Sequence, residues 1–273
     1  MKFRKGLSMW VGVGLFACGP LPSEEVEEHS EDVEFGDPEE AKKDTSGCNG
    51  IATPDTGLFG KQIALTFDDG VNLDSTPKVL DILKSRGVKV TFLVVGRTIT
   101  TEAHRDVLRR MKAEGHLVGS HSWSHPNFKA ISYEKAKQQV LKTKKVLAEV
   151  GIFDPYFRFP YGNATCKTAA FVRAQGYHVV GWDFGSGDWC YNVGHGFCPK
   201  KTYKYMAEGH RHDQLKYIKE VAAKNQGGVM LNHDSHLYTV ETLDGILTAL
   251  KSEGYTFVRL DDVSVFPKMS AAN

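Results

Sequence analysis

The chain has 273 residues, of which 41% are apolar and 25% are charged, and its formal net charge is +1. These values are ordinary for a globular protein, and we expect no nucleic-acid partner. The charge is uneven, because residues 24–40 carry ten acidic side chains and no lysine or arginine, whereas residues 45–273 carry 29 basic and 22 acidic ones. This mild excess of positive charge is compatible with binding an anionic polymer, although a charge excess of this size more often belongs to an ordinary solvated surface.

Residues 1–18 resemble a secretory signal peptide, because three basic residues precede an apolar stretch at 6–17 that is too short for a comfortable membrane span. The sequence Leu-Phe-Ala-Cys at 15–18 is similar to the cleavage box of bacterial lipoproteins, which predicts lipidation of Cys18. Phe16 departs from the small or hydroxylated residue usual in that box, so conventional cleavage is the alternative. We therefore expect export, either as a periplasmic or envelope-anchored lipoprotein or as a secreted protein.

Residues 19–47 are acidic, poor in apolar side chains and interrupted by proline and glycine. Such a segment cannot bury enough apolar surface to order itself, which predicts a solvated, disordered tether. A single folded domain is then expected at 48–273. We expect it to be a monomer whose contact with a membrane is limited to the N-terminal lipid.

Lipidation of Cys18 would leave an even set of four cysteines in an oxidising compartment: Cys48, Cys166, Cys190 and Cys198. Four cysteines allow three pairings. We favour Cys190 with Cys198 as a short loop staple, which leaves Cys48 with Cys166. A cysteine metal site is the rival interpretation, but the chain lacks paired C-x-x-C spacing.

Strand-like and helix-like segments alternate from residue 61 onward. Strands are predicted at 63–67, 88–95, 116–120, 177–183, 228–232 and 255–260, and helices at 76–86, 103–114, 133–150, 166–175, 212–224 and 239–252. In the helix predicted at 133–150, Val140, Leu141, Val146 and Leu147 are expected to face inward. Repeated βα units of this size predict an α/β fold with about seven parallel strands, closed or nearly closed into a distorted barrel.

Residues 190–211 break this alternation, since they contain three glycines and a proline and show no sustained periodicity. A loop of this length is either functional or mobile. We interpret it as a disulfide-pinned rim over a cleft that helps to choose the substrate. A decorative insertion is the equally weighted alternative.

Polar motifs follow the strand-like runs. They are Asp68-Asp69-Gly70, His121-Ser122-Trp123-Ser124-His125, Arg158-Phe159-Pro160-Tyr161-Gly162, Asp183 to Asp188-Trp189, and Leu231-Asn232-His233-Asp234. Each alone would fit a turn or a surface feature, but ends of parallel strands share one face of the sheet. In this order the five motifs resemble those of polysaccharide deacetylases of carbohydrate esterase family 4, over roughly residues 60–262.

The resemblance implies metal-dependent removal of acetyl groups from a polysaccharide. A divalent metal activates water and polarises a carbonyl, and two histidines with one carboxylate leave positions open for both. Matched residue by residue, Asp69, His121 and His125 would bind the metal, which we expect to be Zn²⁺, with Co²⁺ or Mn²⁺ as alternatives. His121 and His125 are expected in a tight turn because Pro126 follows them.

The same resemblance assigns the remaining roles. Asp68 would be the general base with Arg158 as its partner, and His233 the general acid, oriented by Asp188. The backbone N–H of Tyr161 would bind the oxyanion, and Trp189 and Leu231 would surround the acetyl methyl.

Peptidoglycan is the first substrate expected, on its N-acetylglucosamine residues, followed by chitin oligomers and acetylated xylan. A carbohydrate-binding protein without turnover is the non-enzymatic alternative. Two departures from the family pattern concern shape, because Val71 replaces the usual proline and Asn232 alters the rim. The remaining histidines, including His195, His210, His212 and His236, are interpreted as surface or rim residues.

Overall fold

The computed structural model describes residues 60–270. The predicted signal segment, the predicted tether, Cys18 and Cys48 lie outside the described residues, so these predictions stay untested. No helix within residues 60–270 has the length and apolarity that crossing a lipid bilayer requires.

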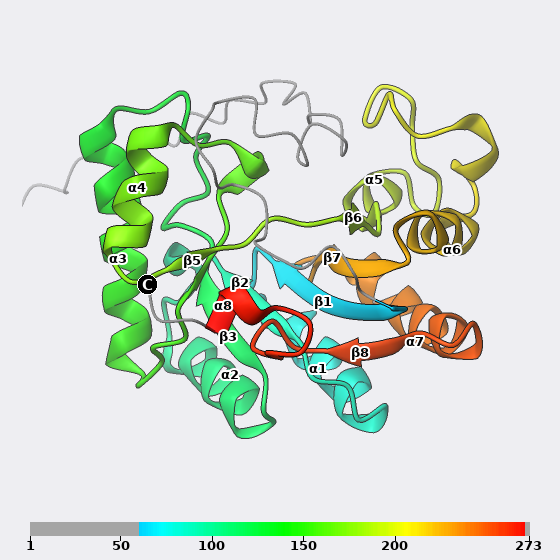
Figure 1. Ribbon diagram of the computed structural model, residues 1–273, viewed down its shortest axis with the longest axis horizontal. Coiled ribbons are helices and arrows are strands. Elements are labelled where there is room, and N and C mark those ends of the chain that lie inside the picture. The colour runs from blue at the N-terminus through cyan, green and yellow to red at the C-terminus, as the bar shows by residue number, and fades with distance from the viewer. Residues whose placement is uncertain (1–59, 271–273) are drawn as a thin grey trace, which may run out of the picture. The chain divides into compact units, whose positions relative to one another are not determined.

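Strands and helices alternate along the described chain, as predicted (Figure 1). The strands are β1 (Gln62–Asp68), β2 (Thr91–Val94), β3 (Leu117–Ser120), β4 (Tyr156–Phe157), β5 (His178–Val179), β6 (Phe184–Gly185), β7 (Gly227–His233) and β8 (Thr256–Val258). The helices are α1 (Thr76–Ser85), α2 (Glu102–Ala113), α3 (Tyr133–Glu149), α4 (Cys166–Ala174), α5 (Asp188–Val193), α6 (Gln214–Asn225), α7 (Leu237–Ser252) and α8 (Pro267–Ser270), with short 3₁₀ turns at Gly96–Thr98, Pro160–Gly162 and Glu208–His210.

The strands form one parallel sheet in the order β5-β4-β3-β2-β1-β7-β6. β8 pairs with the first half of β1, and β2 pairs with its second half. The sheet curls into a half-barrel with helices around it (Figure 1). The predicted fold class, an α/β distorted barrel with about seven parallel strands, is confirmed.

The strand predicted at 177–183 is a strand only at β5, and β6 begins after its predicted end, which corrects the expectation. Val180 donates its N–H to the Phe157 carbonyl at 2.8 Å, whereas Asp183 donates to the Val229 carbonyl at 2.8 Å. The segment therefore leaves β4 and joins β7, which lies on the other arm of the sheet. No single neighbouring strand can pair with the whole segment, so only β5 and β6 remain as short strands.

Alternation along the strands separates two apolar layers. In β1, Ile63, Leu65 and Phe67 pack with the helices. Ala64 packs instead in a second cluster with Leu93, Leu117, Tyr156 and Val229 from other strands and with Val180, which follows β5. Successive side chains of a strand point to opposite faces, so the second cluster is the inner face of the half-barrel. Val265, Phe266 and Met269 from the C-terminal segment join this cluster.

The same alternation decides which polar residues enter the half-barrel. Asp68 follows Ala64 by four residues, His121 follows Leu117 by four, and His233 follows Val229 by four, so each lies on the inner face near the end of its strand. Parallel strands bring these C-terminal ends to one edge of the sheet. The fold thus gathers the predicted site at one end of the barrel interior.

One predicted core position in α3 is wrong. Val140, Val146 and Leu147 are buried, but the side chain of Leu141 is 44% exposed. Because each helical residue turns by about 100°, the residue after Val140 lies off the buried stripe.

A disulfide bond joins Cys190 and Cys198, which are eight residues apart. Cys166 is also disulfide-bonded, and its predicted partner Cys48 lies outside the described residues. The segment 190–211 is more ordered than the predicted loop, because α5 continues to Val193 and a 3₁₀ turn occupies Glu208–His210.

Candidate active site

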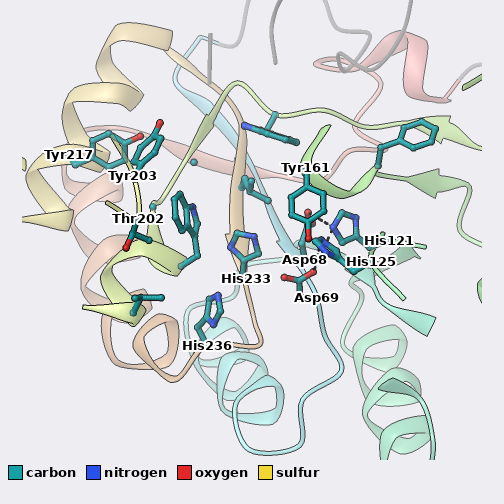
Figure 2. Close-up of a pocket in the computed structure, with 17 residues that line it drawn as sticks. Asp68, Asp69, His121, His125, Tyr161, Thr202, Tyr203, Tyr217, His233 and His236 are labelled. Atoms are coloured by element: carbon teal, nitrogen blue, oxygen red, sulfur yellow. Dashed lines mark ion pairs between the residues drawn. The ribbon is translucent and has the colours of Figure 1, made fainter. Parts of the chain in front are cut away.

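Two histidines and one carboxylate converge at the end of β1 and the turn after β3 (Figure 2). The Asp69 Oδ1 lies 3.7 Å from the His121 Nε2 and 3.5 Å from the His125 Nε2. His121 and His125 lie in a turn rather than a helix, as predicted from Pro126. One potential ligand atom from each of the three residues falls within 4.8 Å of the others, so the cluster could hold a metal ion.

Two observations support this fit. The Asp69 Oδ1 is buried and has no hydrogen-bond partner within the described residues, which is costly unless another group binds it. The His121 Nδ1 donates to the Arg158 carbonyl at 2.8 Å, which leaves the Nε2 as the free lone pair. Burial lowers the pKa of His121 to about 3, so this imidazole stays neutral and able to coordinate.

Asp68 lies beside this cluster and forms a buried ion pair with Arg158. The Arg158 Nη1 donates to the Asp68 Oδ1 at 2.7 Å, and the two side chains are 1% and 3% exposed. The same guanidinium donates to the Thr66 hydroxyl and to the carbonyls of Val180 and Gly181. Burial raises the pKa of Asp68 above its usual value, although the Arg158 charge opposes this rise. Arg158 therefore fixes the orientation of Asp68 without lowering its pKa below the ordinary range.

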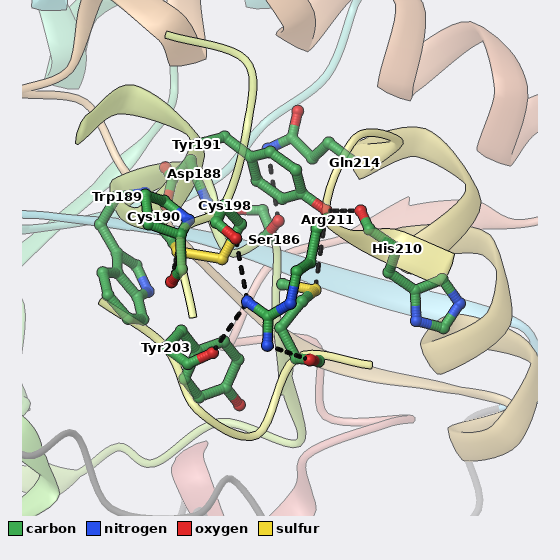
Figure 3. The surroundings of a disulfide bond; sticks show 12 residues. Ser186, Asp188, Trp189, Cys190, Tyr191, Cys198, Tyr203, His210, Arg211 and Gln214 are labelled. Carbon is green, nitrogen blue, oxygen red and sulfur yellow. Dashed lines mark hydrogen bonds between the residues drawn. A yellow bond between two sulfur atoms is a disulfide. The ribbon is translucent and has the colours of Figure 1, made fainter. Parts of the chain in front are cut away.

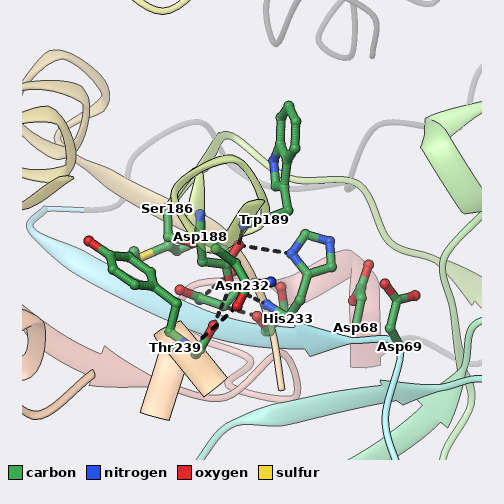
Figure 4. A network of polar contacts seen from close by, with 12 residues as sticks. Asp68, Asp69, Ser186, Asp188, Trp189, Asn232, His233 and Thr239 are labelled. Carbon is green, nitrogen blue, oxygen red and sulfur yellow. Dashed lines mark hydrogen bonds and ion pairs between the residues drawn. The ribbon is translucent and has the colours of Figure 1, made fainter. Parts of the chain in front are cut away.

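His233, at the end of β7, forms a second polar pair with Asp188 at the start of α5 (Figure 4). The His233 Nδ1 donates to the Asp188 Oδ1 at 2.9 Å, and the His233 backbone N–H donates to Oδ2 at 2.6 Å. Thr239 and the Trp189 backbone N–H also donate to this carboxylate. Four donors hold Asp188 in place, and His233 keeps its Nε2 free for other contacts.

The charges of this pair reinforce one another. Burial alone would lower the pKa of His233, but the charge and hydrogen bond of Asp188, with smaller contributions from Asp69 and Asp68, raise it to about 9. Burial would likewise raise the pKa of Asp188, but the His233 charge and hydrogen bonds lower it to about 2. His233 is therefore an imidazolium at neutral pH, paired with a carboxylate.

One cleft joins the metal cluster, Asp68 and His233, and the structure brings all ten predicted site residues to it. Those that line it are Asp68, Asp69, His121, His125, Tyr161, Trp189, Leu231 and His233. Arg158 and Asp188 lie buried behind the residues that they contact. Tyr161 has a φ of 58° and packs the edge of its ring on His125, with 4.6 Å between the ring centroids.

His236 fits its interpretation as a surface or rim residue. It lines the cleft, and its ring centroid lies 5.5 Å from that of His233, whereas His195, His210 and His212 do not line it. His236 follows His233 by three residues, and this spacing was the only signal in the sequence. Val193, Thr202 and Tyr203, from the segment 190–211 that was interpreted as a rim, also line the cleft. The lining residues for which the sequence predicted no role are Phe159, Trp182, Gly185, Gly187 and Tyr217.

Asp234 is a further residue to which the sequence gave no role. Its carboxylate is fully buried and accepts hydrogen bonds from the Gly70 backbone N–H at 3.1 Å and from the Thr76 hydroxyl. Its carbonyl accepts from the Ser75 hydroxyl at 2.5 Å. Burial raises the pKa of Asp234 to about 7. Asp234 thereby ties the end of β7 to the loop that carries Asp69.

We expect Asp234→Ala to lower the free energy of unfolding by about 3 kcal/mol, because it leaves the Gly70 N–H and the Thr76 hydroxyl buried without an acceptor. Chemical denaturation measures this change. Asp244→Ala is the control, because Asp244 forms only an exposed ion pair with Arg86, and its loss should leave stability nearly unchanged. Equal stabilities of the two variants would contradict the role given to Asp234.

Comparisons with known proteins agree with this geometry. A family model described as polysaccharide deacetylase matches residues 58–180. A peptidoglycan-N-acetylglucosamine deacetylase from Listeria monocytogenes is 37% identical over 204 residues, which cover 74% of this chain and 39% of the relative. The chain thus spans well under half of that relative's length.

Two further relatives match over most of their own length. A peptidoglycan-N-acetylglucosamine deacetylase from Bacillus cereus is 32% identical over 212 residues, which cover 75% of this chain and 69% of the relative. The solved structure of a chitin deacetylase from Colletotrichum lindemuthianum superposes with a TM-score of 0.62 at 30% identity, covering 74% of this chain and 87% of the other. The chain therefore belongs to the polysaccharide deacetylase family.

Proposed function

We propose that the protein is a metal-dependent hydrolase that removes N-acetyl groups from N-acetylglucosamine residues of an extracytoplasmic polysaccharide, with peptidoglycan as the first candidate. The observation that carries the proposal is the arrangement of the cleft. A buried carboxylate held by an arginine and an imidazolium held by a carboxylate both reach the same space as a three-residue metal cluster.

Asp69, His121 and His125 would hold the metal ion. Zinc is the first candidate, and Co²⁺ or Mn²⁺ suit the same ligands. When bound, a divalent ion lowers the pKa of water and polarises a carbonyl group. The Ser122 hydroxyl accepts the His125 backbone N–H at 3.1 Å and so supports the turn that presents this ligand.

Asp68 would act as general base. It adjoins the ligand Asp69, and its Oδ2 lies 3.6 Å from the His121 Nε2. Arg158 holds the other oxygen, Oδ1, so Oδ2 faces the cleft and can take a proton from the attacking water. The raised pKa of Asp68 makes it a stronger base than an exposed aspartate.

Tyr161 would stabilise the developing oxyanion through its backbone N–H. Pro160 and the positive φ of Tyr161 set the direction of this peptide at the cleft wall. The ring of Tyr161 packs against His125, which keeps the turn next to the metal cluster.

His233 would protonate the departing amine, since its Nδ1 is bonded to Asp188 and its Nε2 remains available. In the complete reaction the water oxygen bonds to the acetyl carbon, the C–N bond breaks, and both water protons end on the nitrogen, which leaves as an ammonium group. The products are acetate and a glucosamine residue. Trp189 and Leu231 line the cleft on the His233 side and would surround the acetyl group.

The choice of polymer rests on the relatives. Peptidoglycan comes first because the Listeria and Bacillus relatives are peptidoglycan deacetylases by name. Chitin oligomers come second because a chitin deacetylase matches at similar identity. Acetylated xylan is the third candidate, and binding of a glycan without turnover is the non-enzymatic one.

The proposed substrate requires export, and the N-terminal sequence supports it. Residues 1–18 resemble a signal peptide, so the protein would act in the periplasm or envelope, anchored through Cys18, or outside the cell after conventional cleavage.

Acetate release from peptidoglycan, chitooligosaccharides and acetylated xylan tests the proposal directly. We expect release from peptidoglycan to exceed that from the other two, to stop with a chelator, and to return when zinc is added. Release from chitooligosaccharides alone would replace peptidoglycan by chitin oligomers as the proposed substrate and would support the proposed reaction. No release from any of the three by folded, metal-loaded protein would contradict the deacetylase proposal and favour a binding role.

We expect Asp68→Asn to lower kcat by about 10² to 10⁴-fold while stoichiometric metal remains bound, because the base is lost and the ligands are kept. His125→Ala should reduce both activity and metal content after dialysis. Asp106→Asn, an exposed change on α2, is the control and should alter neither quantity. Full activity of Asp68→Asn would exclude Asp68 as the base.

Asp188→Asn should move the alkaline limb of the kcat/KM profile to lower pH by at least about one unit. The Asp188 carboxylate stabilises the protonated form of His233, so its neutralisation lowers the pKa of His233 from about 9 and deprotonates the acid earlier. Thr239→Val keeps the carboxylate charge and should leave the limb nearly in place. An unchanged limb in Asp188→Asn would show that another group donates the proton.

A further inference from the structure

The cleft continues beyond the proposed catalytic residues. Its volume is about 380 Å³, and it extends past His233 to Tyr203 and Tyr217 (Figure 2). In Figure 2, Tyr203 and Tyr217 lie on the opposite side of His233 from His121. We call this second part of the cleft the inner lobe, and assign to it the lining residues Gly185, Gly187, Trp189, Thr202, Tyr203, Tyr217 and Leu231. None of these side chains carries a charge.

The inner lobe has fixed walls. The Tyr203 ring packs edge-on against Trp189, with 5.3 Å between the ring centroids, and both Gly187 and Tyr203 are buried. Arg211, itself 2% exposed, donates to the carbonyls of Cys198, Tyr203 and Met206 (Figure 3). With the disulfide bond to Cys198, these contacts hold the tyrosine-bearing segment in place. The lobe is therefore built into the fold.

The chemistry of an N-acyl sugar selects what can enter the lobe. The carbonyl carbon of the amide must lie near Asp68 and His233. The two groups attached to it, the nitrogen that bears the sugar and the acyl chain, then extend from this point in different directions. The sugar ring carries hydroxyl groups and chain neighbours, which require the open mouth of the cleft. The acyl chain carries only carbon and hydrogen beyond the carbonyl, so it suits a lobe lined by aromatic rings and glycine backbone.

Gly185 leaves this path open. It pairs with Leu231 across β6 and β7, and register partners of neighbouring strands point to the same side of the sheet. Both residues line the cleft. A Cβ built on Gly185 would meet no atom closer than 3.8 Å, so a side chain is compatible with the backbone and would occupy lobe space.

We propose that the inner lobe is an acyl-chain pocket that lets the protein hydrolyse N-propionyl and N-butyryl glucosamine residues as well as N-acetyl ones. The proposal rests on the proposed function, since the same base and acid cleave the same C–N bond. Water supplies the oxygen of the released carboxylate, and both of its protons end on the nitrogen as the ammonium group, so propionate or butyrate leaves in place of acetate. Gly185 determines how long a chain is accepted.

The test uses peptidoglycan fragments and chitooligosaccharides that are chemically de-N-acetylated and then re-acylated with acetyl, propionyl or butyryl groups. Release of free amine is one readout for all acyl lengths. We expect kcat/KM for the propionyl and butyryl substrates to lie within about tenfold of the acetyl value. A pocket that closed behind the acetyl methyl would instead lose roughly a hundredfold or more.

Gly185→Val should lower the ratio of butyryl to acetyl kcat/KM by at least about tenfold, because its side chain fills the lobe. Gly245→Val is the matched control, since Gly245 is an exposed position in α7 with nothing within 4 Å of an added Cβ. This control should keep the wild-type ratio.

The outcomes separate the two proposals. Hydrolysis of acetyl substrates with loss of butyryl hydrolysis in the wild type would overturn the acyl-chain pocket and leave the deacetylase proposal intact. A wild-type ratio in Gly185→Val would equally overturn the assignment of the lobe. Absence of hydrolysis for every acyl length would overturn the deacetylase proposal, and the pocket with it.

Discussion

The buried ion pair between Arg158 and Asp68 is the contact on which the rest of the site depends. Removing both charges from water is costly, and the guanidinium offsets this cost through three further donations to oxygen atoms, one in β1 and two in the segment after β5. Its own backbone carbonyl accepts from His121. One residue thus sets the orientation of both the proposed base and a proposed ligand, and lysine could not reproduce this planar set of donors.

Backbone strain is concentrated around the same cluster. Within residues 60–270, four of the seven non-glycine residues with positive φ are Asp69, Ser122, His125 and Tyr161. Each such residue costs on the order of 1 kcal/mol or more, so the surrounding contacts must stabilise it. Asp234 holds the loop after Asp69, and the Ser122 hydroxyl holds the turn at His125. The strained backbone places the site residues in fixed positions and lowers local stability. Contacts from Asp234 and Ser122, which do not line the cleft, offset this loss.

The sequence predicted what depends on local pattern. Apolar periodicity placed the long elements, and the motifs placed residues such as Asp68 and His233, because strand ends and short motifs are visible along the chain. It failed where the determinant is distant in sequence. The strand predicted at 177–183 is interrupted because Val180 and Asp183 hydrogen-bond to different strands. Asp234 was missed because its role arises from contacts with a segment far away in the sequence, which no spacing records.

The two arms of the cleft are built from separate parts of the sheet. β1 and the turn after β3 carry the metal cluster, whereas β6, α5 and β7 carry the pair of Asp188 and His233 together with the inner lobe. α5 connects the His233 pair with the inner lobe. It begins with Asp188, the partner of His233, and contains Cys190, whose disulfide bond fixes the segment that carries Tyr203. Changes in that segment can therefore reshape the lobe while the metal cluster stays fixed. Such a division would let acyl preference vary on an unchanged hydrolytic centre, because Tyr203 and Tyr217 lie outside the five family motifs, whereas Trp189 and Leu231 lie within them.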